Sequence, residues 1–203
     1  MKVIAIKLAS VVLCLAVGLL VVLDCFTEES AAVEPTFEQY VTFYAWLDND
    51  PPGNRIAYPR SEYPRAVHEV AGGTGTYADP LTAASDPTEW PIGTRLYAPF
   101  LRKYLVVEDW CEACVRDWRQ SRKHHVDVWM NSNQSTGDRV HECAYRWTQD
   151  RASLEVNPPR GRAVDTRPLF DTSSNTCLES AFGDDLPVSF RPGSGGQRWW
   201  PGQ

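Results

Sequence analysis

Short runs of aromatic and β-branched residues, separated by turns rich in Gly, Pro, Asn and Asp, fill residues 41–147. Such runs predict β-strands of about 4–8 residues, because branched and aromatic side chains pack well on a pleated sheet. Many short strands with little helix favour an all-β domain closed into a small barrel. Strands are expected at residues 41–46, 94–98, 104–107, 125–130 and after 71–77, and one or two helical turns within 114–122.

The first 32 residues have the organisation of a secretory signal peptide. Lys2 and Lys7 precede an apolar run over residues 8–23, and small residues at 30–32 offer a cleavage site. This run is shorter than the roughly 20 residues that a membrane-spanning helix needs. We therefore predict a signal peptide at residues 1–32 and a secreted, extracellular protein.

The rest of the chain divides by composition. Residues 33–40 form a short lead-in, residues 41–149 the predicted barrel domain, and residues 150–203 a tail rich in Pro, Gly and Arg that is partly tethered by Cys177. The asparagine of the Asn-Gln-Ser sequence at Asn133 lies in a polar turn and could carry a glycan in a glycosylating host.

The charge of the chain bears on its partners. The formal net charge is −6, and no cluster of basic residues interrupts the acidic balance. This argues against nucleic acid as a partner. We expect a monomer with no cofactor and no contact with a membrane after signal cleavage. A retained signal anchor is the alternative, whereas a lipid anchor at Cys25 is disfavoured because Asp24 precedes it.

The cysteines agree with export. Two of the six lie in the predicted signal peptide, which leaves four. Four cysteines in an oxidising compartment predict two disulfide bonds with three possible pairings. The four are Cys111, Cys114, Cys143 and Cys177.

The Cys111-x-x-Cys114 spacing is open to three interpretations. A redox pair is disfavoured because no βαβ pattern surrounds it. A zinc site with His141 or Cys143 has suitable ligand types. A structural disulfide is preferred in a secreted chain, with Cys143 then pairing with Cys177, so no metal is expected.

Three aspartates occupy similar settings. Asp86 opens a Pro- and Gly-containing turn, Asp109 ends an apolar run, and Asp127 stands between Val126 and Val128. Successive side chains of a strand point to opposite faces, so Asp127 must face away from a core that the two valines fill. Acids collected along one groove suit glycosidic-bond chemistry.

The motifs around these acids resemble a known family. Asp86-Pro87-x-x-x-Pro91-Ile92-Gly93-Thr94, followed by Glu108-Asp109 and then Val126-Asp127-Val128, resembles the 3D domain, which is named for its three aspartates. The resemblance covers residues 41–147. It implies a six-stranded double-psi β-barrel, related to the barrel of lytic transglycosylase A, rare-lipoprotein-A-like proteins, expansins and family-45 glycoside hydrolases. The chain departs from the family after Asp109, where Trp-Cys replaces the usual Thr-Gly-Gly.

The resemblance also implies roles for the acids. Asp127 would be the general acid, with Asp109 and Asp86 beside it, and Asp48 or Asp50 would supply a base if the protein is a hydrolase. A lytic transglycosylase could work with one acid alone. The alternative for each carboxylate is a structural one, in which it accepts hydrogen bonds from turn and strand-end N–H groups.

Aromatic residues close to the acids could stack on sugar rings, although ordinary core packing would equally explain each of them. The sequence thus predicts a secreted protein that acts on cell-wall polysaccharide, either by cleaving glycosidic bonds or by binding and loosening the polymer. A non-catalytic interaction protein, such as an effector, is the alternative. The candidate stacking residues are Trp90, Trp110, Trp129 and Tyr77.

Overall fold

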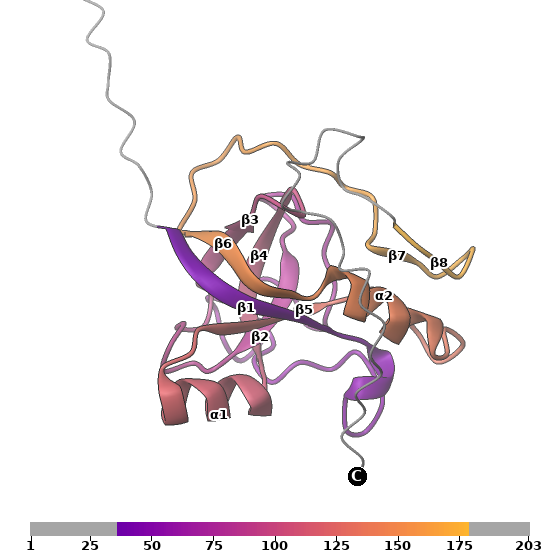
Figure 1. Cartoon of the computed structure of the whole chain (residues 1–203), viewed down its shortest axis with the longest axis horizontal. Helices are drawn as coiled ribbons and strands as arrows, with labels where there is room; N and C mark the ends of the chain where they lie inside the picture. The colour runs from indigo at the N-terminus through magenta and orange to yellow at the C-terminus, as the bar shows by residue number, and fades with distance from the viewer. Residues whose placement is uncertain (1–35, 179–203) are drawn as a thin grey trace, which may run out of the picture. The chain divides into compact units, whose positions relative to one another are not determined.

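The computed structural model describes residues 36–178, whose centre is a closed barrel of six strands (Figure 1). This confirms the expected all-β, six-stranded barrel. Around the barrel the strands follow one another as β1 (Thr36–Tyr44), β5 (His125–Trp129), β2 (Leu81–Ser85), β4 (Lys103–Trp110), β3 (Arg95–Ala98) and β6 (Gln149–Val156), and β6 then pairs with β1.

The strand pairings are related by an internal symmetry. The pairs β1–β5 and β2–β4 are parallel, and all other neighbouring pairs are antiparallel. Exchanging the first three strands with the last three converts every pair into another pair of the same direction. This two-fold arrangement of crossed parallel strands is the double-psi barrel topology that the sequence predicted.

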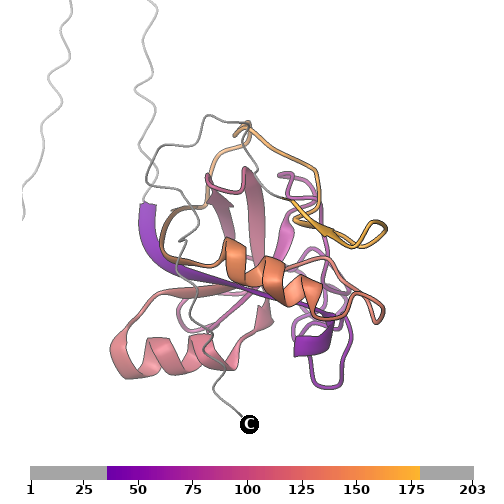
Figure 2. The same cartoon turned by 45° about the vertical axis from the view of Figure 1, so that its right-hand side comes forward.

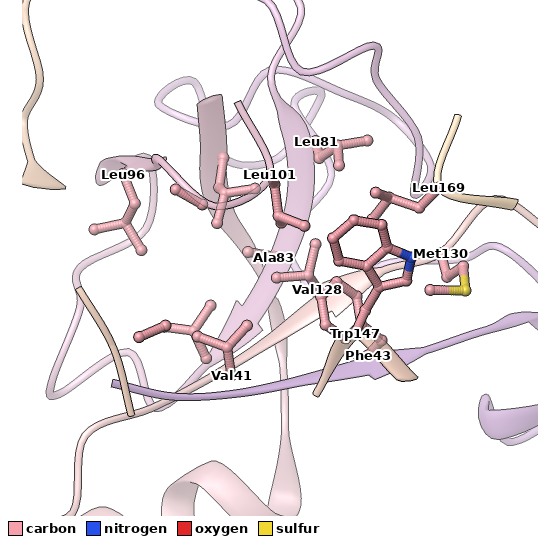
Figure 3. Close-up of a cluster of buried hydrophobic side chains, with 14 of the residues drawn as sticks. Val41, Phe43, Leu81, Ala83, Leu96, Leu101, Val128, Met130, Trp147 and Leu169 are labelled. Carbon is pink, nitrogen blue, oxygen red and sulfur yellow. The ribbon is translucent and has the colours of Figure 1, made fainter. Parts of the chain in front are cut away.

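The barrel interior is filled by alternate residues of its strands. Figure 3 shows Val41, Ala83, Leu96 and Val128 meeting there from four different strands. Val126 and Val128 are fully buried in this core, as the alternation around Asp127 predicted. Each buried valine or leucine contributes about 1.5–3 kcal/mol by burial.

The last barrel strand lies beyond the predicted domain boundary. Residues after 149 were assigned to the tail, yet β6 extends to Val156 and pairs with both β1 and β3. Its residues Ala152, Leu154 and Val156 are buried while their neighbours are not, a period of two that the sequence displays. The first strand likewise begins at Thr36, inside the predicted lead-in.

Within the described residues, two α-helices lie outside the barrel (Figures 1 and 2), and a short 3-10 helix, η1 (Trp46–Asp48), follows β1. Helix α1 (Glu112–Ser121) packs on β5 and β2; the sulfur of Cys111 accepts a hydrogen bond from the N–H of Cys114 at its first turn. Helix α2 (Arg139–Trp147) covers β1 through an apolar face that includes Trp147. The sequence predicted one or two helical turns near α1 and nothing at α2.

Two disulfide bonds hold the periphery. Cys111, which directly precedes α1, is bonded to Cys114 in its first turn. Cys143 of α2 is bonded to Cys177. The second bond ties the barrel to a small hairpin of β7 (Phe170–Asp171) and β8 (Thr176–Cys177). The preferred pairing and the tether through Cys177 are therefore confirmed.

Lys103 fixes the segment that follows the barrel. Its side chain is buried, and its Nζ donates to the backbone oxygens of Thr74, Asp165 and Arg167 at 3.3, 2.5 and 2.8 Å. Burial lowers the pKa of Lys103 to about 8. The three carbonyl oxygens replace the water that the ammonium loses on burial. Because they belong to two different loops, the Lys103 side chain connects these loops.

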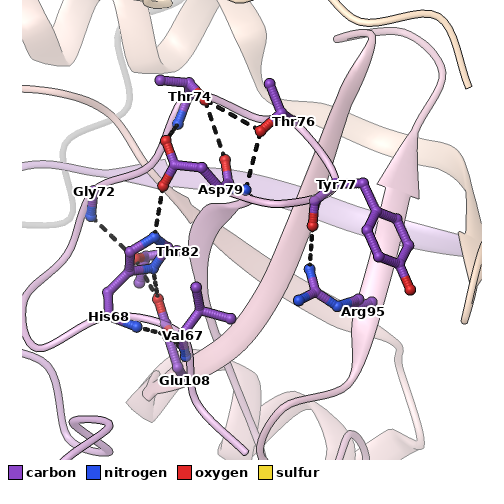
Figure 4. Close-up of polar contacts among 10 residues, drawn as sticks. All are labelled: Val67, His68, Gly72, Thr74, Thr76, Tyr77, Asp79, Thr82, Arg95 and Glu108. Atoms are coloured by element: carbon purple, nitrogen blue, oxygen red, sulfur yellow. Dashed lines mark hydrogen bonds and ion pairs between the residues drawn. The ribbon is translucent and has the colours of Figure 1, made fainter. Parts of the chain in front are cut away.

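The long connection from β1 to β2 is held by a partly buried cluster of ionisable side chains, which Figure 4 shows. His68 places Nδ1 2.6 Å from Glu108 and Nε2 2.9 Å from Asp79. Burial opposes charge on Glu108, but hydrogen bonds from His68, Thr82 and the N–H of Val67 lower its pKa. The cluster therefore attaches this connection to β4.

The same connection needs glycine at one tight point. Gly73 has a φ of +96°, and a Cβ there would lie 1.9 Å from the carbonyl oxygen of Pro80. Only a residue without a side chain fits such an approach.

Within residues 36–178, no helix has the length and apolar character needed to cross a bilayer. The predicted signal peptide at residues 1–32 and the end of the tail lie outside the described residues.

Candidate functional site

Strand register aligns the site across four neighbouring strands. Thr42 of β1 is opposite Asp127 of β5, Asp127 is opposite Ala84 of β2, and Ala84 is opposite Asp109 of β4. Residues opposite one another project from the same side of a sheet. Asp127 and Asp109 thus face the same side, about 10 Å apart at two strand spacings, with only the methyl group of Ala84 between them.

A β-bulge brings Asp109 into this row. The register between β2 and β4 shifts after Ala83, which is opposite Val107. Ala84 is then opposite Asp109, and Glu108 is the extra residue, with no residue of β2 opposite it. Without the extra residue, Ala84 would be opposite Glu108 and Asp109 would face the other side. Bulges re-aim side chains in this way and are common beside functional sites.

The row forms one wall of a cleft of about 540 Å³. The connection after β1 and the start of α1 provide the other walls. Acids and the exposed Arg55 line it, so the cleft combines groups that can bind a hydroxyl-rich ligand. Its lining includes Tyr44, Asp48, Asp50, Arg55, Asp109, Trp110, Glu112 and Asp127.

Asp127 is partly buried in this cleft, where its Oδ1 accepts a hydrogen bond of 2.7 Å from the hydroxyl of Thr42. Burial raises the pKa of Asp127 to about 7, and the negative charges of Asp48 and Asp109 act in the same direction. A carboxyl with such a pKa is protonated near neutral pH, which a general acid requires.

Asp109 lines the cleft but is held by three donors. Its carboxylate accepts from the hydroxyl of Tyr44 and from the backbone N–H groups of Ala57 and Trp110, each at 2.8 Å. Burial raises the pKa of Asp109, and these donors oppose the rise. Asp109 therefore anchors Tyr44 and the connection after β1, and it adds negative charge near Asp127.

The two candidate bases, Asp48 and Asp50, both line the cleft. Asp48 accepts a hydrogen bond of 2.7 Å from the N–H of Ala45, and its other oxygen lies 3.4 Å from Nε2 of His141. It is near enough for its charge to raise the pKa of Asp127. Asp48 is thus the better placed of the two to act on a ligand beside Asp127.

Asp86 does not line this cleft. It is buried at the end of β2, where Oδ1 accepts from both the N–H and the hydroxyl of Thr88, and Oδ2 lies 3.8 Å from Arg119. The Asp-Pro sequence thus opens a turn, the structural alternative considered for it. Of the three expected aspartates, Asp109 and Asp127 line the cleft and Asp86 does not. Asp48 lines the cleft with them.

One of the four candidate stacking residues has an open face at the cleft. Trp110 is 48% exposed there, whereas Trp129 is buried against Tyr44 and Trp90 is buried beside Phe37. Tyr77 lies away from the cleft, between Tyr104 and two arginines. The bulky rings of Trp90 and Trp129 fill space between elements, which explains why sequence proximity to the acids misassigned them.

The structure also tests the alternatives for the cysteines. The two sulfurs of the Cys111–Cys114 disulfide lie within 4.8 Å of a ring nitrogen of His125. Bonded sulfurs do not ligate zinc as thiolates. His141 and Cys143, the zinc partners considered from sequence, are absent from this group.

Asn133 is exposed, which fits a glycosylation site.

Fold and site together define a double-psi β-barrel protein with an acid-lined cleft beside one exposed tryptophan. Residues 36–178 match the family described as the DDB_G0273701 N-terminal domain, and the chain belongs to this family. No solved structure matches the chain.

A relative from Dictyostelium discoideum has the name "Uncharacterized protein DDB_G0273701/DDB_G0273221". It is 32% identical over 151 residues, which are 74% of this chain and 64% of the relative. The chain thus spans less than two thirds of the relative's length.

Proposed function

We propose that this chain is a secreted protein that acts on cell-wall polysaccharide, with Asp127 as the general acid that protonates a glycosidic oxygen. The observation that carries the proposal is the pairing of a carboxyl whose pKa is about 7 with a cleft that also holds Asp48 and an exposed Trp110. The resemblance of the aspartate motifs to the 3D domain and rare-lipoprotein-A-like barrels supports the same reaction class.

The chemistry follows from the positions of the groups. A sugar ring stacked on Trp110 would bring a glycosidic oxygen toward Asp127, which donates its proton as the bond to the anomeric carbon breaks. Asp48 would activate a water on the opposite face in an inverting hydrolase. In a lytic transglycosylase a hydroxyl of the sugar itself would attack, and Asp48 would then serve only to raise the pKa of Asp127.

Asp127→Asn tests the reaction because it keeps the shape of the side chain and removes the transferable proton. Release of soluble or reducing sugar from peptidoglycan, chitin, β-glucan and cellulose should fall by about 100-fold or more. Asp138→Asn is the matched control, since Asp138 is exposed and its side chain makes no capping hydrogen bond. Equal activity of Asp127→Asn and wild type on every cleaved polymer would refute the acid role.

Binding without cleavage is the second candidate. The three donors on Asp109 favour it, because they hold this acid of the cleft as a structural group and not as a reacting one. In that case Asp127→Asn would still sediment with insoluble polysaccharide and Trp110→Ala would not. A protein that neither binds nor cleaves any of the four polymers would favour the effector-like alternative.

A further inference from the structure

A continuous chain of hydrogen bonds leads from Asp127 away from the cleft. The hydroxyl of Thr42 lies 2.7 Å from Oδ1 of Asp127 and 2.9 Å from Nε2 of His125. Nδ1 of His125 lies 2.9 Å from the carboxylate of Asp117 on α1. His125 and Asp127 are two residues apart on β5 and thus share a face, and Thr42 bridges them from β1.

The number of protons in this chain is limited by the single hydrogen of the hydroxyl. Thr42 can donate to Asp127 or to His125, but not to both at once. If Thr42 donates to His125, its contact with Asp127 is a hydrogen bond only when Asp127 carries a proton. If Thr42 donates to an ionised Asp127, its contact with His125 requires a proton on Nε2.

Asp117 determines the protonation of the other ring nitrogen of His125, Nδ1. Its carboxylate accepts hydrogen bonds, so Nδ1 of His125 carries a hydrogen in both cases. Neutral His125 then has a bare Nε2 that accepts from Thr42, and Asp127 is protonated. The other arrangement has an imidazolium at His125 and a carboxylate at Asp127. Both contain three protons for three hydrogen bonds and have the same total charge.

We propose that Asp127 and His125 hold one proton between them, exchanged through the hydroxyl of Thr42. In the exchange the proton of Asp127 moves to Thr42 while the proton of Thr42 moves to Nε2 of His125, and no proton enters or leaves the chain. His125 is thus a positioning residue for Asp127. The inference uses the proposed function only to say what the shared proton serves.

The surroundings favour the arrangement with the proton on Asp127. Burial lowers the pKa of His125, with Asp117 opposing the shift and the charges of Lys123 and Arg116 adding to it. Burial raises the pKa of Asp127, and the charges of Asp48 and Asp109 add to that shift, while a hydrogen bond donated by Thr42 opposes it.

Other neighbours of His125 include Tyr40, whose ring centroid lies 4.6 Å away, and the Cys111–Cys114 disulfide, which does not titrate. The carboxylate of Glu89 is hydrogen-bonded to the backbone of His125, and the hydroxyl of Ser85 donates to its backbone oxygen. If Asp127 lost its proton to solvent while His125 stayed neutral, Thr42 would have one hydrogen for two acceptors, and one of its two hydrogen bonds would break. The hydrogen-bond chain from Asp127 to Asp117 therefore keeps Asp127 protonated.

The test is a double-mutant cycle read by NMR on the disulfide-bonded chain with labelled Asp carboxyl carbons and His ring nitrogens. His125→Leu removes the acceptor that competes for the hydroxyl, so the titration midpoint of Asp127 should fall by about one pH unit. In a Thr42→Val background the same replacement should cause no shift, because the connection is absent. Thr42→Ser should restore the shift, and Tyr40→Phe is a control that preserves the chain.

Two results would overturn the proposal. One is an equal shift from His125→Leu in the wild-type and Thr42→Val backgrounds, which would mean a packing or electrostatic effect. The other is a wild-type His125 with its proton on Nε2 rather than Nδ1 at pH 5. If His125→Leu does not fold, Thr42→Val alone must still change the Nε2 resonance.

These readouts need no substrate. Coupling without any sugar release would refute the acid role and leave the shared proton standing. Sugar release without coupling would do the reverse.

Discussion

Replacing Asp127 with Asn removes a titratable proton from the barrel wall and keeps the side chain's shape, so it measures what this carboxyl does to stability. Burial raises the pKa of Asp127 from 3.8 to about 7 in the folded protein. Between these values the folded state keeps a proton that the unfolded state has released. Linkage then requires the contribution of Asp127 to the stability of the wild type to decrease as pH rises from about 4 to about 7.

The size of the effect follows from the shift. Three pH units at 1.36 kcal/mol per unit give about 4 kcal/mol as an upper value. Asp127 borders an open cleft, and water reduces such costs, so we expect about 2 kcal/mol. Asp127→Asn carries no proton to lose and should lack this decrease. It should match the wild type near pH 4 and exceed its stability above pH 7.

Urea unfolding followed by tryptophan fluorescence at pH 4, 6 and 8 measures both proteins under the same conditions. Asp138→Asn, at an exposed position, should follow the wild type at each pH. A constant difference between Asp127→Asn and wild type across the three pH values would refute the reasoning, because it would mean that Asp127 ionises in the folded protein as it does in the unfolded one.

Three further predictions concern the second disulfide bond, two tryptophans and Lys103. Removing the Cys143–Cys177 disulfide, whose cysteines are 34 residues apart, should cost about 4 kcal/mol in urea unfolding by the loop-entropy relation, and a loss below about 1 kcal/mol would show that the hairpin unfolds separately. Trp110→Ala should abolish polysaccharide sedimentation at unchanged melting temperature, whereas Trp129→Ala should cost about 3–5 kcal/mol because the ring is buried; the reverse result would exclude Trp110 from binding. Lys103→Met should leave three carbonyls without their donor and increase amide hydrogen exchange at residues 157–169; unchanged exchange there would contradict the role of Lys103.

Features that depend on nearby residues were predictable from the sequence. The valines on either side of Asp127 determine its face, because strand alternation is a local rule. The Cys111–Cys114 disulfide likewise joins residues only three positions apart. The same alternation at Ala152, Leu154 and Val156 would have identified β6, had the proline- and arginine-rich composition of the region not suggested a tail.

Features that depend on register between distant strands were not predictable. The bulge that turns Asp109 toward the cleft is defined by the pairing of β4 with β2, and no residue type indicates it. The proximity of Thr42 to Asp127 joins residues 85 positions apart. Asp86 has a sequence as suggestive as that of Asp109, yet its turn directs it to Thr88. Only the assembled barrel distinguishes the two.

The crossed connectivity of the barrel has a consequence for how the protein acquires its cleft during folding. Every strand pair except β3–β4 joins elements that are not consecutive along the chain, so ordering them is entropically costly and slow. The row from Thr42 to Asp109 draws on both halves, and neither half can form it alone. The cleft therefore arises only when the barrel closes. Any trapped intermediate with an open barrel lacks this row of residues, so the polysaccharide binding that we propose should return only as the barrel closes during refolding.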